Sequence, residues 1–237
     1  MLDAIENAST RRGFVTTAAV AAAAVMLAKP ARVFAVSPAF TFSNIPGSGD
    51  VQVLNYALAL EDLEADLYAQ AVARLTSGNA SRGIKGLKIS KYAPDVRTVA
   101  EFGKVEIEHR DFLRSALTSV GGPVISPFKY DFNINSLNRK DVLNLIYTAE
   151  KTGVAAYLGA IPLLSINSPY LQIAGAIQGT EARHTAYVAE TINFMFHTAI
   201  PVAPLAGGGT TALSKAGIDE PLTPDAVLAA VSPFIVA

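Results

Sequence analysis

Residues 102–113 read FGKVEIEHRDFL, and this stretch carries the most informative pattern in the chain. Glu106 and His109 stand three positions apart, so on a helix their side chains lie on one face. That face is apolar, because Phe102 and Leu113 flank the pair at helical spacing. A carboxylate and an imidazole on a buried face cost free energy unless they pair with each other or bind a metal. The pattern therefore predicts a polar site inside a helical protein.

The same pattern recurs near the C-terminal end. Residues 181–184 read EARH, and Ile177 and Val188 flank them at helical spacing. Two of the three histidines in the chain thus follow a glutamate at this interval. Two further glutamates, Glu61 and Glu150, stand on apolar stripes at a similar depth in other helical segments. We therefore expect one Glu/His level to which four helices contribute.

Apolar residues at helical spacing predict four long helices separated by polar or Gly/Pro-rich segments. The expected helices cover about residues 50–75, 94–120, 138–161 and 169–197. Asp50 is expected to cap the first helix, and either Ser136 or Asn138 the third. Four helices of about 25 residues each favour an all-α four-helix bundle.

The connections constrain how these helices run. Residues 121–137 could extend to about 58 Å, whereas a helix of about 25 residues is only about 38 Å long. This segment could therefore cross the whole bundle and join two parallel helices. The link over 78–91 is also long, and length alone does not choose between the two.

The bundle is expected over residues 36–200, and both ends of the chain differ from it in composition. Residues 201–237 form a tail with a Gly-rich start. Within it, Thr223 and Pro224 are expected to begin a short helix that Pro233 ends, with the last apolar residues docking on the bundle.

The first 35 residues are expected to be an export signal. The arginine pair at 11–12 precedes an Ala-rich apolar run over 18–28, which is shorter than the about 20 residues that span a bilayer. Small residues up to Ala35 fit cleavage after that residue. The pattern resembles a twin-arginine signal and predicts an exported, periplasmic protein with no membrane segment after cleavage. An amphipathic N-terminal helix or an uncleaved anchor is the alternative.

Composition narrows the classes of function. The chain has 237 residues, with 19 Lys+Arg against 20 Asp+Glu, so no basic stripe and no nucleic-acid partner are expected. It contains no cysteine, which excludes disulfides, thiolate metal sites and a cysteine nucleophile. Hydrophobic residues make up 51% of the chain, which indicates a folded domain rather than a disordered one.

Carboxylates and imidazoles at one level of a bundle predict a dinuclear metal site. Each metal would take one histidine and one terminal carboxylate, and two further carboxylates would bridge the pair. Hard oxygen ligands with single imidazoles suit iron or manganese better than copper, and zinc stays open. The candidate ligands are Glu61, Glu106, His109, Glu150, Glu181 and His184. Glu64, one turn after Glu61, could replace that residue or add a ligand.

Two tyrosines repeat the glutamate pattern. Tyr68 follows Glu61 by seven residues, and Tyr157 follows Glu150 by seven. This repeat implies a pseudo-twofold bundle made of two helical hairpins. We expect the tyrosines to pack in the core with their hydroxyls bonded to ligand carboxylates.

The chain resembles the ferritin-like superfamily, and within it the exported ferritin-like domain proteins that include desiccation-related proteins. The resemblance spans roughly residues 40–200, and the segments that carry it are 54–64, 106–109, 155–160 and 181–184. It implies a bundle with a long crossover over residues 121–137, between the second and third helices. It also implies the six candidate ligands given above.

Three functions remain open on the sequence. The leading one is redox chemistry at a di-iron or di-manganese centre in stress protection, with Fe(II) oxidation or reduction of peroxide or oxygen. The alternative is a non-enzymatic stress or desiccation-related protein that has the bundle fold and no catalytic metal. An iron-storage cage is disfavoured by the Gly/Pro-rich tail after residue 200. Metal ions and oxygen or peroxide are the expected partners. A second copy of the chain, in a homodimer, is a further candidate.

Overall fold

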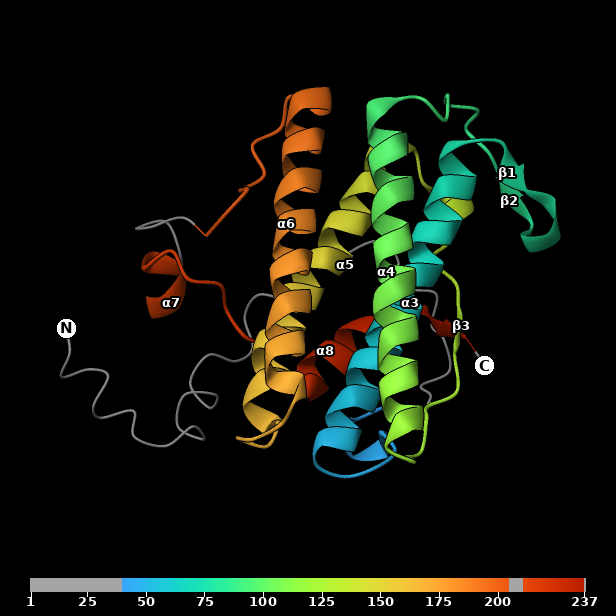
Figure 1. The fold of residues 1–237 in the computed structure, drawn as a ribbon. Coiled ribbons are helices and arrows are strands. Elements are labelled where there is room, and N and C mark those ends of the chain that lie inside the picture. The colour runs from blue at the N-terminus through green and yellow to red at the C-terminus, as the bar shows by residue number, and fades with distance from the viewer. Residues whose placement is uncertain (1–39, 205–210, 237) are drawn as a thin grey trace.

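The computed structural model describes residues 40–204 and 211–236. It is dominated by four long helices, α3 (Asp50–Leu75), α4 (Pro94–Ser119), α5 (Arg139–Ala160) and α6 (Tyr170–Phe196). These helices lie side by side as a bundle (Figure 1), which confirms the predicted fold class. The expected signal segment and its cleavage site after Ala35 lie outside the described residues.

The four helices form two hairpins. Helix α3 packs along α4, and α5 packs along α6. Helices α4 and α5 run in the same direction, and the segment between them returns along the length of the bundle (Figure 1). The predicted crossover between the second and third helices is therefore confirmed, and it is the segment 121–137 that makes it.

The crossover is tied to the C-terminal end of the chain. Strand β3 (Lys129–Tyr130) pairs antiparallel with β4 (Ile235–Val236). Just before β4, Phe234 packs on the bundle core, as predicted for the apolar ending. Helix α8 (Pro224–Val231) begins where predicted, because the Thr223 side chain accepts a hydrogen bond from the Ala226 N–H.

Several short elements complete the described chain. They are the 3-10 turns η1 (Phe42–Asn44), η2 (Ala80–Arg82), η3 (Ile134–Ser136), η4 (Ile161–Leu163) and η5 (Ser232–Phe234), the strands β1 (Gly78–Asn79) and β2 (Ile84–Lys85), and helix α7 (Ala212–Lys215). Strands β1 and β2 form a small antiparallel hairpin inside the predicted 78–91 loop. Within the described residues, no helix has the length and apolarity needed to cross a bilayer.

The helix starts agree with the sequence at α5 but not at α3. Asn138 caps α5 by accepting the N–H of Asp141. The expectation that Asp50 caps α3 is wrong, because Gly49, with a positive φ of 55°, takes the cap position and Asp50 is the first helical residue. The Asp50 carboxylate instead accepts the backbone N–H of Ser165 at 2.7 Å. It thereby ties the start of α3 to the turn between α5 and α6.

The bundle core has two apolar clusters. One contains Leu58, Leu117 and their neighbours, and the other contains Leu143, Ile192 and theirs. Each such fully buried aliphatic side chain stabilises the fold by about 1.5–3 kcal/mol. Along every long helix, the six principal candidate ligands fall between the residues of one cluster and those of the other, whereas Glu64 follows Leu63 of the second cluster. The apolar burial on both sides offsets the free-energy cost of placing charges in the middle.

Candidate metal centre

Each long helix delivers at least one buried glutamate to the centre of the bundle. Glu61 on α3, Glu106 on α4, Glu150 on α5 and Glu181 on α6 are all 0% exposed. This placement follows from the helical period, which puts each of them on the same face as the apolar residues of its helix. The two histidines come with the glutamates of α4 and α6. His184 is buried, and the His109 side chain is 14% exposed.

The ligand atoms form two overlapping groups, within each of which all atoms lie within 4.8 Å of one another. The first group is Glu61, Glu106, His109 and Glu181, and the second is Glu106, Glu150, Glu181 and His184. Glu106 and Glu181 belong to both groups. The shared carboxylates are thus those of the two Glu-x-x-His motifs, a choice that the sequence left open. Each group keeps one histidine and one glutamate of its own.

Both histidines turn the same nitrogen toward the carboxylates. His109 Nδ1 lies 2.9 Å from Glu106 Oε2, 3.5 Å from Glu61 Oε2 and 3.6 Å from Glu181 Oε1. His184 Nδ1 lies 2.8 Å from Glu106 Oε1 and 3.3 Å from Glu150 Oε1. His109 therefore lies beside one carboxylate oxygen of Glu106, and His184 lies beside the other.

Many of these buried atoms lack a hydrogen bond. Within the described part of the chain, the unpartnered atoms of the cluster are Glu61 Oε2, Glu106 Oε1, Glu150 Oε2, both carboxylate oxygens of Glu181, and His184 Nδ1. The short approach of His184 to Glu106 therefore lacks the angle of a hydrogen bond. An unsatisfied buried polar group costs about 1–3 kcal/mol, and more when it is charged. Unpartnered oxygens and an imidazole nitrogen that face one another form a donor set that fits iron or manganese.

The pKa values of the clustered glutamates and histidines also indicate that positive charge stabilises this site. Burial raises the pKa of Glu61 to about 7 and raises that of Glu150. Burial alone would lower the pKa of the histidines, but neighbouring carboxylates, Glu106 foremost, raise it to about 10 for His109 and about 9 for His184. Without metal, protons on the imidazoles supply part of the compensating charge.

Two tyrosine hydroxyls fix the unshared carboxylates. Tyr157 on α5 donates to Glu61 Oε1 at 2.5 Å, and Tyr68 on α3 donates to Glu150. Each tyrosine thus holds a glutamate of the helix on which the other tyrosine stands. The repeated Glu/Tyr spacing predicted hydroxyls bonded to ligand carboxylates, but not which tyrosine bonds which glutamate. Hydrogen bonds of this kind orient ligands and tune a metal site.

A contact that the sequence did not reveal covers the second histidine. The ring of Phe102, on α4, stacks on the imidazole of His184, on α6, with centroids 3.8 Å apart and planes 17° from parallel. Sequence analysis identified Phe102 only as part of an apolar stripe. The contact depends on how α4 and α6 are rotated toward each other, which a single helix pattern does not specify.

Glu64, on α3, lies beside the cluster, and the matching position on α5 is not a glutamate. Glu64 is buried, but among the described residues it stands outside both ligand groups, so Glu61 is the α3 residue that the geometry places in the first group. On α5 the corresponding position is Gly153. A Cβ there would lie 2.5 Å from Glu181 Oε2 and 3.1 Å from Glu64 Oε1. The glycine therefore leaves space that two carboxylates use.

Comparison with known proteins agrees with this architecture. The family model described as a ferritin-like domain matches residues 49–193. The matched range contains both Glu-x-x-His motifs, Glu61, Glu150 and the two tyrosines. No curated protein sequence matches the chain.

Proposed function

The chain belongs to the ferritin-like domain family, and from that premise we propose that it binds a dinuclear iron or manganese centre and uses it to oxidise Fe(II) or to reduce oxygen or peroxide. One observation carries the proposal. Buried carboxylate oxygens without hydrogen-bond partners within the described residues face one another in two groups that share Glu106 and Glu181.

The donor set assigns a role to each residue. Glu61 and His109 would hold one ion, Glu150 and His184 would hold the other, and the shared Glu106 and Glu181 would bridge the two. Two divalent ions would balance four carboxylates and leave both imidazoles neutral, which removes the cost of buried, uncompensated charge. Glu64 is a fifth carboxylate beyond this balance.

The metal ions would supply the electrons for the reaction, and protein side chains would orient the ligands and exclude water. When bound, two such ions supply two electrons, which with two protons reduce O₂ to H₂O₂ or reduce one H₂O₂ to two waters. The hydroxyls of Tyr68 and Tyr157 hold the unshared carboxylates in one orientation. The Phe102 ring covers His184, and the apolar clusters on either side keep bulk water out.

The cellular role is a further part of the proposal. The arginine pair and apolar run before Ala35 support export to the periplasm, and a redox centre there would protect against peroxide or free Fe(II). Fractionation of cells with N-terminal sequencing tests this. A mature chain that begins at residue 36 in the periplasm is expected, and an uncleaved cytosolic chain would contradict it.

A non-catalytic stress or desiccation-related protein is the second candidate. The hydrogen bond of 2.9 Å between His109 and Glu106, with the tyrosine contacts, favours it, because these bonds hold part of the cluster together without metal. This candidate predicts no consumption of oxygen or peroxide when Fe(II) or Mn(II) is added.

Metal loading tests the main proposal. The full chain is incubated without oxygen with Fe(II) or Mn(II), freed of excess ions and analysed for bound metal. About two ions per chain are expected. Glu106→Gln should lose both, because Glu106 belongs to both groups, whereas Glu108→Gln, an exposed change on the same helix, should keep both. Fewer than about one ion in the unmodified chain, or equal loading of the two variants, would contradict the proposal.

A further inference from the structure

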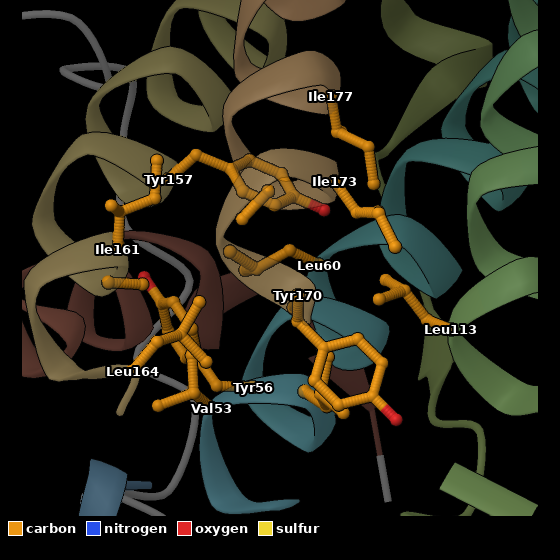
Figure 2. A pocket seen from close by; sticks show the side chains of 14 residues that line it. Val53, Tyr56, Leu60, Leu113, Tyr157, Ile161, Leu164, Tyr170, Ile173 and Ile177 are labelled. Carbon is orange, nitrogen blue, oxygen red and sulfur yellow. The ribbon is translucent and has the colours of Figure 1, made fainter. Parts of the chain in front are cut away.

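An apolar cavity lies beside the turn that joins α5 to α6 (Figure 2). We propose that it is the binding site through which molecular oxygen, rather than peroxide, reaches the cluster. The inference rests on the proposed redox function and names its oxidant.

One end of the cavity touches residues that hold the cluster. Tyr157 lines it and donates its hydroxyl to Glu61. Leu60 immediately precedes Glu61, and Ile177 stands one helical turn before Glu181 (Figure 2). Tyr157 therefore connects the cavity to the first ligand group through Glu61, although none of the candidate ligands is itself among the lining residues.

The other end of the cavity approaches solvent. Ile161, Tyr170, Ile173 and Ala174 line it and are all partly exposed. They stand on both sides of the α5–α6 turn (Figure 2). Small movements of these side chains would admit a molecule from outside, so the cavity offers a short path from the end of the bundle to the cluster.

The lining of the cavity favours an apolar molecule over a polar one. Apart from tyrosine hydroxyls, the lining side chains are hydrocarbon. The Tyr157 hydroxyl is engaged by Glu61, and the buried Tyr56 hydroxyl has no hydrogen-bond partner among the residues that the structure describes. Burial raises the pKa of Tyr56 far above its ordinary value, so this hydroxyl stays neutral. The hydroxyl of Tyr56, with that of Tyr170 at the partly exposed end, cannot replace the several hydrogen bonds that peroxide makes in water, whereas O₂ makes almost none.

The size of the cavity limits its occupant. The space open to the centre of a water-sized sphere is about 20 Å³. One water needs about 10–15 Å³ of such space and two to four polar partners, so an apolar cavity with few polar groups tends to stay dry. A diatomic molecule fits, whereas an alkyl chain or a sugar does not.

Xenon is the probe for the cavity itself, because it is apolar and needs no metal. A crystal of the metal-free full chain under xenon pressure should show xenon beside Leu60, Tyr157 and Ile177. Ala174→Phe should remove it by filling the outer end, and Ala174→Met is a second blocking variant with a more flexible side chain. The control Ala176→Phe, an exposed change on the same helix outside the lining, should keep the xenon. Absence of xenon from the cavity of the unmodified chain would overturn the proposal.

The oxidant is tested with the Fe(II)-loaded protein. Ala174→Phe should slow oxidation by O₂ by about tenfold, because the larger ring fills the apolar space that would hold O₂ near the cluster in an otherwise densely packed interior. Peroxide is polar and would instead approach from solvent beside the partly exposed His109, so oxidation of Ala174→Phe by H₂O₂ should stay close to that of Ala176→Phe. Equal slowing of both reactions, or no slowing with O₂, would overturn the assignment of O₂. Failure to bind metal would contradict the proposed function instead, and the xenon result separates the two failures.

Discussion

The hydroxyl of Tyr157, on α5, donates a hydrogen bond of 2.5 Å to the Glu61 carboxylate, on α3. Tyr68 of α3 returns the same contact to Glu150 of α5. The two hairpins are therefore locked to each other across the cluster by a reciprocal pair of buried hydrogen bonds. Each carboxylate so held is the one that belongs to a single ligand group.

Removal of one hydroxyl should show the strength of this lock. We expect Tyr157→Phe to lower the free energy of unfolding of the metal-free chain by about 1.5–3 kcal/mol, the range for a hydrogen bond to a charged group. Tyr56→Phe is the matched control. Its hydroxyl is equally buried and has no partner among the described residues, so its loss should be neutral or stabilising. Urea unfolding measures both, and equal stability of the two variants would contradict the account.

Glu61 and Glu64 should differ in their effect on metal content. Glu61→Gln should reduce the bound ions from about two to about one per chain, because Glu61 belongs to the first group only. Glu64→Gln should keep about two, because Glu64 stands outside both groups. If Glu64→Gln lost an ion and Glu61→Gln did not, Glu64 would be the ligand of α3.

Gly153 should resist a substitution that normally stabilises helices. Gly→Ala in a helix gains about 0.5–1 kcal/mol, and we expect that gain at Gly175, where an added Cβ meets nothing within 4 Å in the described part of the chain. At Gly153 the same Cβ would lie 2.5 Å from Glu181 Oε2. Gly153→Ala should therefore destabilise the chain and weaken metal binding by about tenfold, through displacement of a shared carboxylate. Calorimetric titration compares the two variants, and a metal affinity equal to that of Gly175→Ala would contradict the role of Gly153.

Asp50 should contribute a pH-dependent part of the stability. Burial alone would raise its pKa, but hydrogen bonds from Ser165 and Ser168 lower it below the ordinary 3.8. A lowered pKa stabilises the fold fully above the unfolded value of 3.8, and the contribution is lost as the pH falls through the lower folded value. Asp50→Asn should therefore cost about 0.5 kcal/mol at neutral pH, where the charge also suits the helix start. The difference should shrink as the pH falls below 3.8 and through the lower folded value, and a constant difference across that range in urea unfolding would contradict this account.

The sequence predicted the helices and the meeting of the candidate ligands because both follow from a local period. A residue four or seven positions from an apolar neighbour shares its helix face, so Glu150 was expected to be buried with Ile146 and Glu106 with Leu113. The resemblance then chose 121–137 as the crossover, which length alone could not do.

Other features depend on relations between elements and could not be predicted. Which carboxylates are shared, and the stacking of Phe102 on His184, depend on the rotation of each helix about its axis. The Glu64 carboxylate lies close to Gly153 because α5 approaches α3 closely, and no single helix pattern shows that approach. The pairing of Lys129 with Val236 joins two-residue strands that are too short to show a period.

Anomalous scattering at the iron and manganese edges, from crystals of the full chain loaded with each metal, tests the central claim most directly. The account predicts two peaks inside the bundle, one beside Glu61 and His109 and the other beside Glu150 and His184, with Glu106 and Glu181 between them. Crystals that show no peak among these residues, or peaks only at the surface, would contradict it.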